Sequence, residues 1–303
     1  MTAVITKLSE MVLMIIIGFI CAKVKISGPE FNRHTSAVLT NVLLPATILK
    51  AMTGLNSGAD NAEVVYVVFL FFLMMGLAGL IGKLVSVIVP LEEDDRGIML
   101  CVIMYMNISF VGFPLVESYY GSEGMFYACL SCVPMNLLMF SSGVAIISGD
   151  KSKGINLKQL LNVPLVATLL GIMLIVLDIR LPSIISSTVQ SLANATIPVS
   201  MIILGSSLAA IPIVSAFTDL RVYAAVAARL VICPIVTNLL LRLFVCNEML
   251  IGVITILAST PVAVLMTPLC VQYGKKEQLA SKSIFITTII SIITMPLIIW
   301  GLL

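Results

Sequence analysis

The stretch "NISFVGFP", residues 107–114, places the amide of Asn107, a glycine and a proline inside a long apolar run. Gly112 and Pro114 are poor helix formers, and Pro114 also lacks a backbone N–H. In a lipid-spanning helix, each backbone group without a partner costs several kcal/mol unless protein or a wet cavity surrounds it. The stretch therefore predicts a broken helix whose freed backbone groups are satisfied by another part of the protein.

The composition predicts a membrane protein. The chain has 303 residues, of which 60% are hydrophobic and 11% charged, and its mean hydropathy is +1.15. Soluble proteins carry about 25% charged residues. Apolar segments long enough to cross a bilayer recur along the sequence, which predicts an all-α polytopic protein surrounded by the lipid bilayer. The net charge of +2 comes without a basic run, so no nucleic acid partner is expected.

The seven cysteines lie mostly inside apolar segments, and their odd number suggests no disulfide framework. Cys129 and Cys132 form a C-x-x-C pair with no further ligand residues nearby, so we interpret them as small packing residues. We expect no metal site and no cofactor. Lys7 precedes an apolar run like that of a signal peptide, but no small-x-small cleavage site follows, which favours a retained first helix.

The apolar runs and their breaks predict ten membrane-spanning helices, at about 4–22, 33–54, 62–89, 97–119, 122–148, 160–178, 184–210, 220–244, 249–271 and 278–302. The loops and helix edges on one side carry eleven basic residues, namely Lys23, Lys25, Arg33, Arg96, Lys151, Lys153, Lys158, Arg221, Lys275, Lys276 and Lys282, against four on the other, namely Lys7, Lys50, Arg180 and Arg242. Because basic loops stay in the cytoplasm, this asymmetry predicts both termini outside a plasma membrane and a cytoplasmic connector at 149–159.

The two halves of the sequence match at a constant offset of 153 residues. The matching pairs are mostly Gly, Pro and Asn rather than common apolar residues, namely Gly18 with Gly171, Pro29 with Pro182, Asn41 with Asn194, Pro45 with Pro198, and Tyr120-Gly121 with Tyr273-Gly274. Each half, residues 1–150 and 151–303, holds five predicted helices. Because five is odd, the repeats enter the membrane from opposite sides, as in many secondary transporters.

The fourth and ninth predicted helices are both interrupted near their midpoints. The midpoint of 97–119 lies beside Asn107, and that of 249–271 lies beside the Thr260-Pro261 step, 153 residues later. One proline alone would be interpreted as a simple kink, since proline is common in membrane helices. Two matched breaks instead favour a midplane site, where half-helix ends present free backbone N–H groups to an anion.

Several motifs resemble those of the auxin efflux carrier (PIN-like) family. "NISFVGFP" is similar to the family's Asn-x-Gly-Phe-x-Gly-x-Pro element, with Ser109 in place of glycine. "NVLLPATIL" at 41–49, "NATIPVSMIILG" at 194–205, "RLVICP" at 229–234 and "ASTPVAVLMTPLCVQYG" at 258–274 resemble further family segments, so the resemblance covers nearly the whole chain. It implies ten helices in two inverted repeats, mixed into scaffold and transport domains, with crossed broken helices 4 and 9 and an elevator-like motion.

The resemblance also implies a substrate class and a site. The short connector is similar to that of the compact bacterial members of the family, some of which carry malate or malonate. In the plant exporters two asparagines hold the substrate carboxylate, and Asn107 and Asn136 match them. The candidate substrate-binding residues are Asn107, Gly112, Pro114, Asn136, Ser259, Thr260 and Pro261. Secondary candidates, which either cap distorted helices or line the site, are Asn41, Pro45, Asn194 and Pro198, together with Arg229, which either meets a backbone terminus or helps to hold an anion.

We therefore predict a secondary transporter of a small organic anion, a mono- or dicarboxylate such as malate or malonate. The alternative is a sodium-coupled bile-acid-type carrier or an ion channel, with Na⁺ near Ser259 and Thr260. Coupling to H⁺ and to Na⁺ both stay open. An enzyme is not expected, because the predicted helices contain no metalloprotease motif and no Asp pair. The plant relatives suggest a homodimer.

Overall fold

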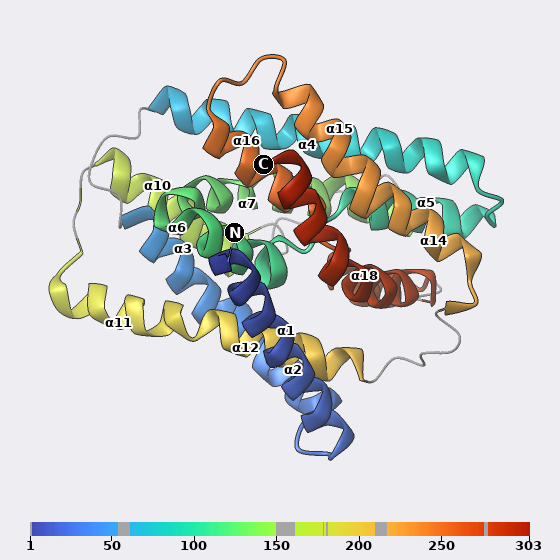
Figure 1. Ribbon diagram of the computed structural model, residues 1–303, viewed down its shortest axis with the longest axis horizontal. Helices are drawn as coiled ribbons and strands as arrows, with labels where there is room; N and C mark the ends of the chain where they lie inside the picture. Colours follow the sequence, from blue (N-terminus) through green and yellow to red (C-terminus); the bar gives the residue numbers. More distant parts are fainter. Residues whose placement is uncertain are drawn as a thin grey trace. The chain divides into compact units, whose positions relative to one another are not determined.

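The computed structural model describes residues 2–53, 61–149, 161–177, 179, 181–209, 217–275 and 278–303 (Figure 1). The predicted connector after Gly149 and the predicted repeat boundary at 150 lie outside the described residues, as do Arg180 and Lys276. Within the described part the chain is helical, apart from turns and a single antiparallel bridge between Met106 and Val262. The predicted all-helical class is confirmed.

Six helical segments are long and apolar enough to cross a membrane, counted over the described residues, at Pro29–Thr53, Ala62–Ile88, Ile108–Ser148, Ser183–Leu208, Leu220–Leu241 and Gln278–Leu302. Two shorter apolar helices lie at Val163–Val176 and Glu248–Ser259. Large apolar side chains such as Ile88 and Ile184 are exposed on their helices, at 78% and 79%. A bilayer would cover such side chains, so the arrangement fits a multi-pass membrane protein, while the count of ten helices stays a prediction.

The chain forms two compact units, each drawing on residues from both sides of position 150. Unit 1 comprises Met1–Val68, Ser109–Val133 and Leu161–Ala210, and unit 2 comprises Phe69–Ile108, Pro134–Leu160 and Ile211–Leu303. Unit 1 contains α1 (Thr2–Lys23), α2 (Pro29–Val38), the π-helix η1 (Leu39–Leu43), α3 (Leu44–Thr53), α6 (Phe113–Leu130), α10 (Val163–Val176), α11 (Ser183–Asn194) and α12 (Thr196–Leu208). The predicted division into two sequence repeats is not tested by these units.

Unit 2 contains α5 (Glu93–Met104), η3 (Met139–Gly143), α8 (Val144–Ser148), α14 (Leu220–Val226), η5 (Ala227–Ile232), α15 (Cys233–Leu241), α16 (Glu248–Ser259), α17 (Met266–Gln272) and α18 (Gln278–Leu302). Three elements run across the unit boundaries, namely α4 (Asn61–Ile88), η2 (Ile108–Gly112) and α7 (Cys132–Leu138).

Glycines set the closest helix packing in unit 1. Helix α1 packs against α12 and crosses it in Figure 1, and a Cβ added to Gly205 would stand 1.9 Å from the carbonyl oxygen of Ile15. A Cβ added to Gly18 would likewise stand 2.2 Å from the carbonyl oxygen of Ile202. Membrane helices associate without a hydrophobic driving force between them, so close packing at small residues contributes to holding them together. The α1 and α12 backbones are therefore in direct contact.

Two buried threonine hydroxyls in unit 1 donate to the carbonyl of Leu43. It accepts hydrogen bonds from the hydroxyls of Thr47, at 3.0 Å, and Thr196, at 3.1 Å, and these two hydroxyls are 2.7 Å apart. Leu43 ends the π-helix η1 just before Pro45, and Thr196 begins α12 just before Pro198. Leu43 and Thr196 are 153 residues apart, so residues related by the sequence offset touch here.

Two glycines related by the same offset adopt a backbone conformation that disfavours other residues. Gly121 has φ +64° and Gly274 has φ +67°, and each follows a tyrosine at the turn after a broken helix. Gly121 combines its positive φ with ψ −152°, a region open essentially only to glycine, where another residue costs about 1–3 kcal/mol. The Tyr-Gly match in the sequence thus corresponds to a glycine with positive φ in both places.

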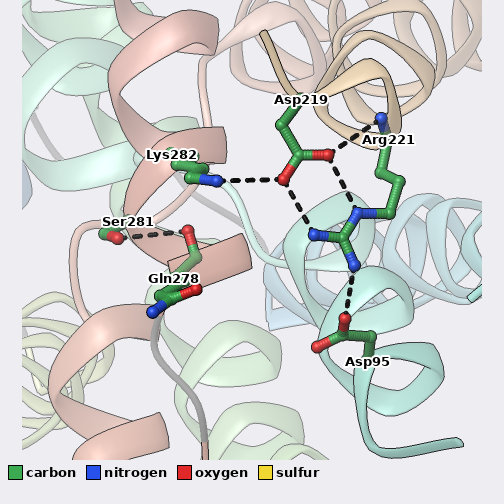
Figure 2. A network of polar contacts seen from close by, with 6 residues as sticks. All are labelled: Asp95, Asp219, Arg221, Gln278, Ser281 and Lys282. Atoms are coloured by element: carbon green, nitrogen blue, oxygen red, sulfur yellow. Dashed lines mark hydrogen bonds and ion pairs between the residues drawn. The ribbon is translucent and has the colours of Figure 1, made fainter. Parts of the chain in front are cut away.

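An ion-pair network joins the beginnings of three helices in unit 2 (Figure 2). Asp219 caps α14 and accepts two hydrogen bonds from the Arg221 guanidinium, at 2.8 and 2.9 Å. Arg221 also donates to Asp95 at the start of α5, at 2.7 Å, and Lys282 of α18 donates to Asp219, at 3.1 Å. Hydrogen bonds from Arg221, together with the Lys282 ammonium, hold the pKa of the Asp219 carboxyl well below its usual range.

Candidate functional site

The two predicted breaks meet inside unit 2 as a short antiparallel pair. Helix α5 ends at Met104, and Tyr105 is extended, with φ −96° and ψ 121°. Helix α16 ends at Ser259, and Thr260 is extended, with φ −66° and ψ 152°. We call residues 105–107 and 260–263 the crossover strands. Proline at position 261 explains the second break, because its ring cannot continue a helix that would need its N–H.

Two backbone hydrogen bonds join the crossover strands. The Asn107 N–H donates to the Pro261 carbonyl at 2.8 Å, and the Ala263 N–H donates to the Tyr105 carbonyl at 3.0 Å. Met106 and Val262 form the bridge between them. Each crossover strand thus supplies one N–H donor and one carbonyl acceptor to the other, which satisfies part of the backbone freed at these buried breaks.

The residues that pair across the crossover strands are separated by nearly the offset of the sequence repeat. The pairs 105 with 263, 106 with 262 and 107 with 261 are 158, 156 and 154 positions apart. Asn107 thus pairs with Pro261, the residue directly after Thr260, which is its counterpart at the offset of 153 residues.

Polar side chains support the crossover from within the protein. Thr287 of α18 accepts a hydrogen bond from the Val262 N–H at 3.2 Å, and Thr287 is fully buried. The hydroxyls of Ser259 and Thr260 each donate to carbonyls of the last turn of α16, both at 2.7 Å. Ser259 and Thr260 are fully buried, and Asn107 is 3% exposed.

Tyr105 links the crossover to the segment that carries Asn136. Its hydroxyl donates to the Leu138 carbonyl at 2.8 Å and lies 3.3 Å from the Ser142 hydroxyl. Leu138 ends α7, where Asn136 lies with a half-buried side chain. Asn107 and Asn136 both lie in unit 2, and the Tyr105 hydroxyl joins the crossover to the last residue of α7.

Arg229 lies against the C-terminal ends of both helices that enter the crossover. Its side chain comes from the π-helix η5 and is fully buried. Its Nε donates to the Thr260 carbonyl at 3.0 Å, and its Nη1 donates to the Ile103 carbonyl at 3.2 Å. Its Nη2 donates to Ala258 at 2.9 Å and more weakly to Leu257 at 3.4 Å. Of the two roles considered from the sequence, these contacts correspond to the backbone terminus.

The candidate residues divide between the two units. Asn107, Asn136, Ser259, Thr260, Pro261 and Arg229 lie in unit 2, whereas Gly112, Pro114, Asn41, Pro45, Asn194 and Pro198 lie in unit 1. Asn41 is exposed in η1 and donates to the Ala37 carbonyl one turn back, at 2.9 Å. Asn194 is exposed, and its amide oxygen accepts from Gln190 at 3.0 Å and from Lys50 at 3.5 Å. Pro45 is buried, and Pro198 is half-buried.

A family model described as "Membrane transport protein" matches the chain twice, over residues 3–154 and 150–299. The chain belongs to this membrane transport protein family, the auxin efflux carrier (PIN-like) family. Two archaeal proteins, each named as an uncharacterized transporter, are similar to it along nearly their whole length. The protein of Methanothermobacter thermautotrophicus is 26% identical over 303 residues, covering 96% of both chains. That of Methanocaldococcus jannaschii is 26% identical over 296 residues, covering 95% of both.

Two contributors to the site of this membrane transport protein were not identified from the sequence. Tyr105 and Thr287 hold the crossover strands through hydrogen bonds to α7 and from Val262. Thr287 lies in a Ser/Thr-rich last helix, which was the only signal available. A threonine in an apolar helix ordinarily donates to its own helix four residues back, as Thr287 also does to Ser283. Its second role depends on which segment packs against α18.

Proposed function

We propose that this protein is a secondary transporter of small organic anions, mono- or dicarboxylates such as malate or malonate. The observation that carries the proposal is the buried pair of crossover strands, with Asn107 at the end of one strand, in a protein of a transport family. Sites of such transporters lie near the membrane midplane, where interrupted helices meet. Asn107 and Asn136 would hold the carboxylate.

The charges around the crossover favour an anion. No Asp or Glu occurs in residues 97–116 or 249–271, which include both breaks. A buried asparagine amide offers two N–H donors, so it can hold a carboxylate without introducing a second negative charge. A cation would meet none of the carboxylates that usually compensate its charge in such a site.

The proposal includes ten helices in two inverted repeats, residues 1–150 and 151–303. It is supported by the offset of 153 residues, which relates the paired breaks, the Leu43–Thr196 contact and the two Tyr-Gly turns. We further propose an elevator-like motion of a transport domain that carries the crossover, with both termini outside the plasma membrane. The containment of both crossover strands within unit 2 supports their movement as one body.

The test is a thermal-shift screen of purified protein against organic acids, including malate and malonate, followed by the variant Asn107→Ala. We expect an acid to raise the melting temperature of the wild type, and we expect Asn107→Ala to lose this shift. The matched control is Asn238→Ala, which removes a buried amide bonded to Thr255 and Arg242 instead of the crossover. It should lower stability but keep the acid-dependent shift. Retention of that shift by correctly folded Asn107→Ala would refute the site.

A further inference from the structure

The C-terminal ends of two broken helices converge on one guanidinium. Ile103 belongs to α5, Leu257 and Ala258 belong to α16, and Thr260 follows α16, yet all four carbonyls accept from Arg229. Arginine has five N–H donors in a fixed planar fork. This one side chain therefore caps carbonyls at the C-terminal ends of both helices.

The positive charge of Arg229 is balanced by backbone dipoles. None of the ion pairs formed by the described residues involves Arg229, and its side chain is fully buried. Each helix C-terminus carries roughly half a negative charge. Two such ends together offset about one positive charge, so the guanidinium and the paired helix ends form a nearly neutral set.

In other transporters, similar carbonyls hold a coupled ion. Unwound backbone carbonyls and half-helix C-terminal ends coordinate Na⁺ or H⁺ in carriers with broken helices, and hard cations accept uncharged oxygen ligands. Here the Arg229 guanidinium already occupies the carbonyls of Thr260 and Leu257. The Ser259 and Thr260 hydroxyls, the other oxygens predicted for Na⁺, donate to helix carbonyls.

We propose that Arg229 is a built-in cation, which fills the carbonyl cluster where a coupling Na⁺ would bind and so makes anion transport independent of Na⁺. The inference rests on the proposed function. Arg229 is a positioning residue, since it contacts the backbone behind the crossover strands. Its guanidinium stays protonated at all physiological pH values, so the cation at this place neither exchanges nor leaves during the transport cycle.

The first test uses the wild type alone. Purified protein in proteoliposomes is assayed for uptake of labelled malonate in sodium, potassium or choline chloride at equal ionic strength. We expect the same uptake rate and apparent KM in all three salts. Uptake that requires Na⁺ would overturn the inference while leaving the anion transporter intact. Absence of saturable uptake of any acid found in the thermal-shift screen would instead overturn the proposed function.

The second test removes the built-in cation. In Arg229→Ala the carbonyl cluster is left without its donors, so we expect a lower melting temperature that rises again when guanidinium chloride is added at low millimolar concentration. The matched control is Arg242→Ala, an exposed arginine of the same unit, whose melting temperature should not rise. Failure of guanidinium to stabilise folded Arg229→Ala selectively would overturn the assignment.

A conservative variant keeps the inference testable if Arg229→Ala does not fold. Arg229→Lys retains the charge but has three N–H donors on a single nitrogen. We expect it to fold, to transport malonate without Na⁺ and to show a lower maximal rate, because the lysine ammonium cannot reach all four carbonyls in the same planar arrangement. A Na⁺ requirement in Arg229→Lys that potassium does not replace would contradict a filled cation site.

Discussion

Replacing Gly205 by alanine tests the close approach of α1 and α12 most sharply. The new Cβ would stand 1.9 Å from the Ile15 carbonyl oxygen and 2.9 Å from the Phe19 nitrogen, where ordinary contact begins near 3.4 Å. The obstacles are backbone atoms, which cannot rotate away. The helices must therefore separate locally by about 1.5 Å, which is the difference between the 3.4 Å of ordinary contact and the 1.9 Å to the Ile15 oxygen. Overpacking of this kind costs about 1–3 kcal/mol, and rigid obstacles place Gly205→Ala near the upper end.

The assay is thermal unfolding in detergent, followed with a thiol-reactive fluorogenic dye. Five of the seven cysteines, such as Cys101 and Cys129, are buried and free, so they react only when the protein unfolds. A loss of 1 kcal/mol lowers the melting temperature of a large domain by about 2–4 °C. We therefore expect Gly205→Ala to unfold about 5–10 °C below the wild type.

Two comparisons make the result specific. Gly76→Ala is the same change on an exposed face of α4, where a Cβ meets nothing within 4 Å, and it should stabilise slightly through helix propensity. Gly18→Ala opens the same α1–α12 interface from the other side, so the double variant with Gly205→Ala should cost less than the sum of the two single changes. Equal melting temperatures for Gly205→Ala and Gly76→Ala would refute the close packing.

Three further predictions concern unit 2. Thr287→Val leaves the buried Val262 N–H without its acceptor and should lower the free energy of unfolding by about 1–3 kcal/mol. Thr288→Val removes a hydroxyl that donates to the Ile284 carbonyl of its own helix, so it should cost less, and melting curves of both variants decide this. Asp219→Asn should unfold at a lower temperature than the wild type at neutral pH. The difference between the two melting temperatures should narrow below about pH 4, because the lowered pKa of Asp219 contributes stability that protonation removes. An equal difference at pH 7 and pH 3 would contradict this. Gly274→Ala should lower the melting temperature more than Gly274→Asn, since asparagine tolerates positive φ better.

The crossover could be predicted from the sequence because its causes are local. Pro261 follows the end of α16, and the offset of 153 residues places the matching break beside Asn107. Pro114 does not interrupt its helix as predicted, because it lies within the helical segment Ile108–Ser148 and the break comes before it, at residues 105–107. The role of Arg229 could not be predicted in this way. Its contacts depend on how η5 packs against α5 and α16. A single arginine in an apolar segment does not indicate which other segments pack against it.

The division into two interleaved units was likewise beyond residue patterns. Periodicity identifies which segments are helical, but the side chains of α1 and α12, or of α5 and α18, are apolar on more than one face in a membrane protein. Asn41 and Asn194 show the same limit, since they match in the sequence but have different partners, the Ala37 carbonyl in one case and Gln190 with Lys50 in the other.

The measurement that tests the central claim most directly is uptake of labelled malonate and malate into proteoliposomes containing wild-type protein or Asn107→Ala. The account predicts saturable uptake by the wild type, competed by the unlabelled acid and lost in the variant, while the variant keeps a cooperative melting transition. Unsaturable flux, an ion conductance without anion uptake, or full uptake by Asn107→Ala would contradict it.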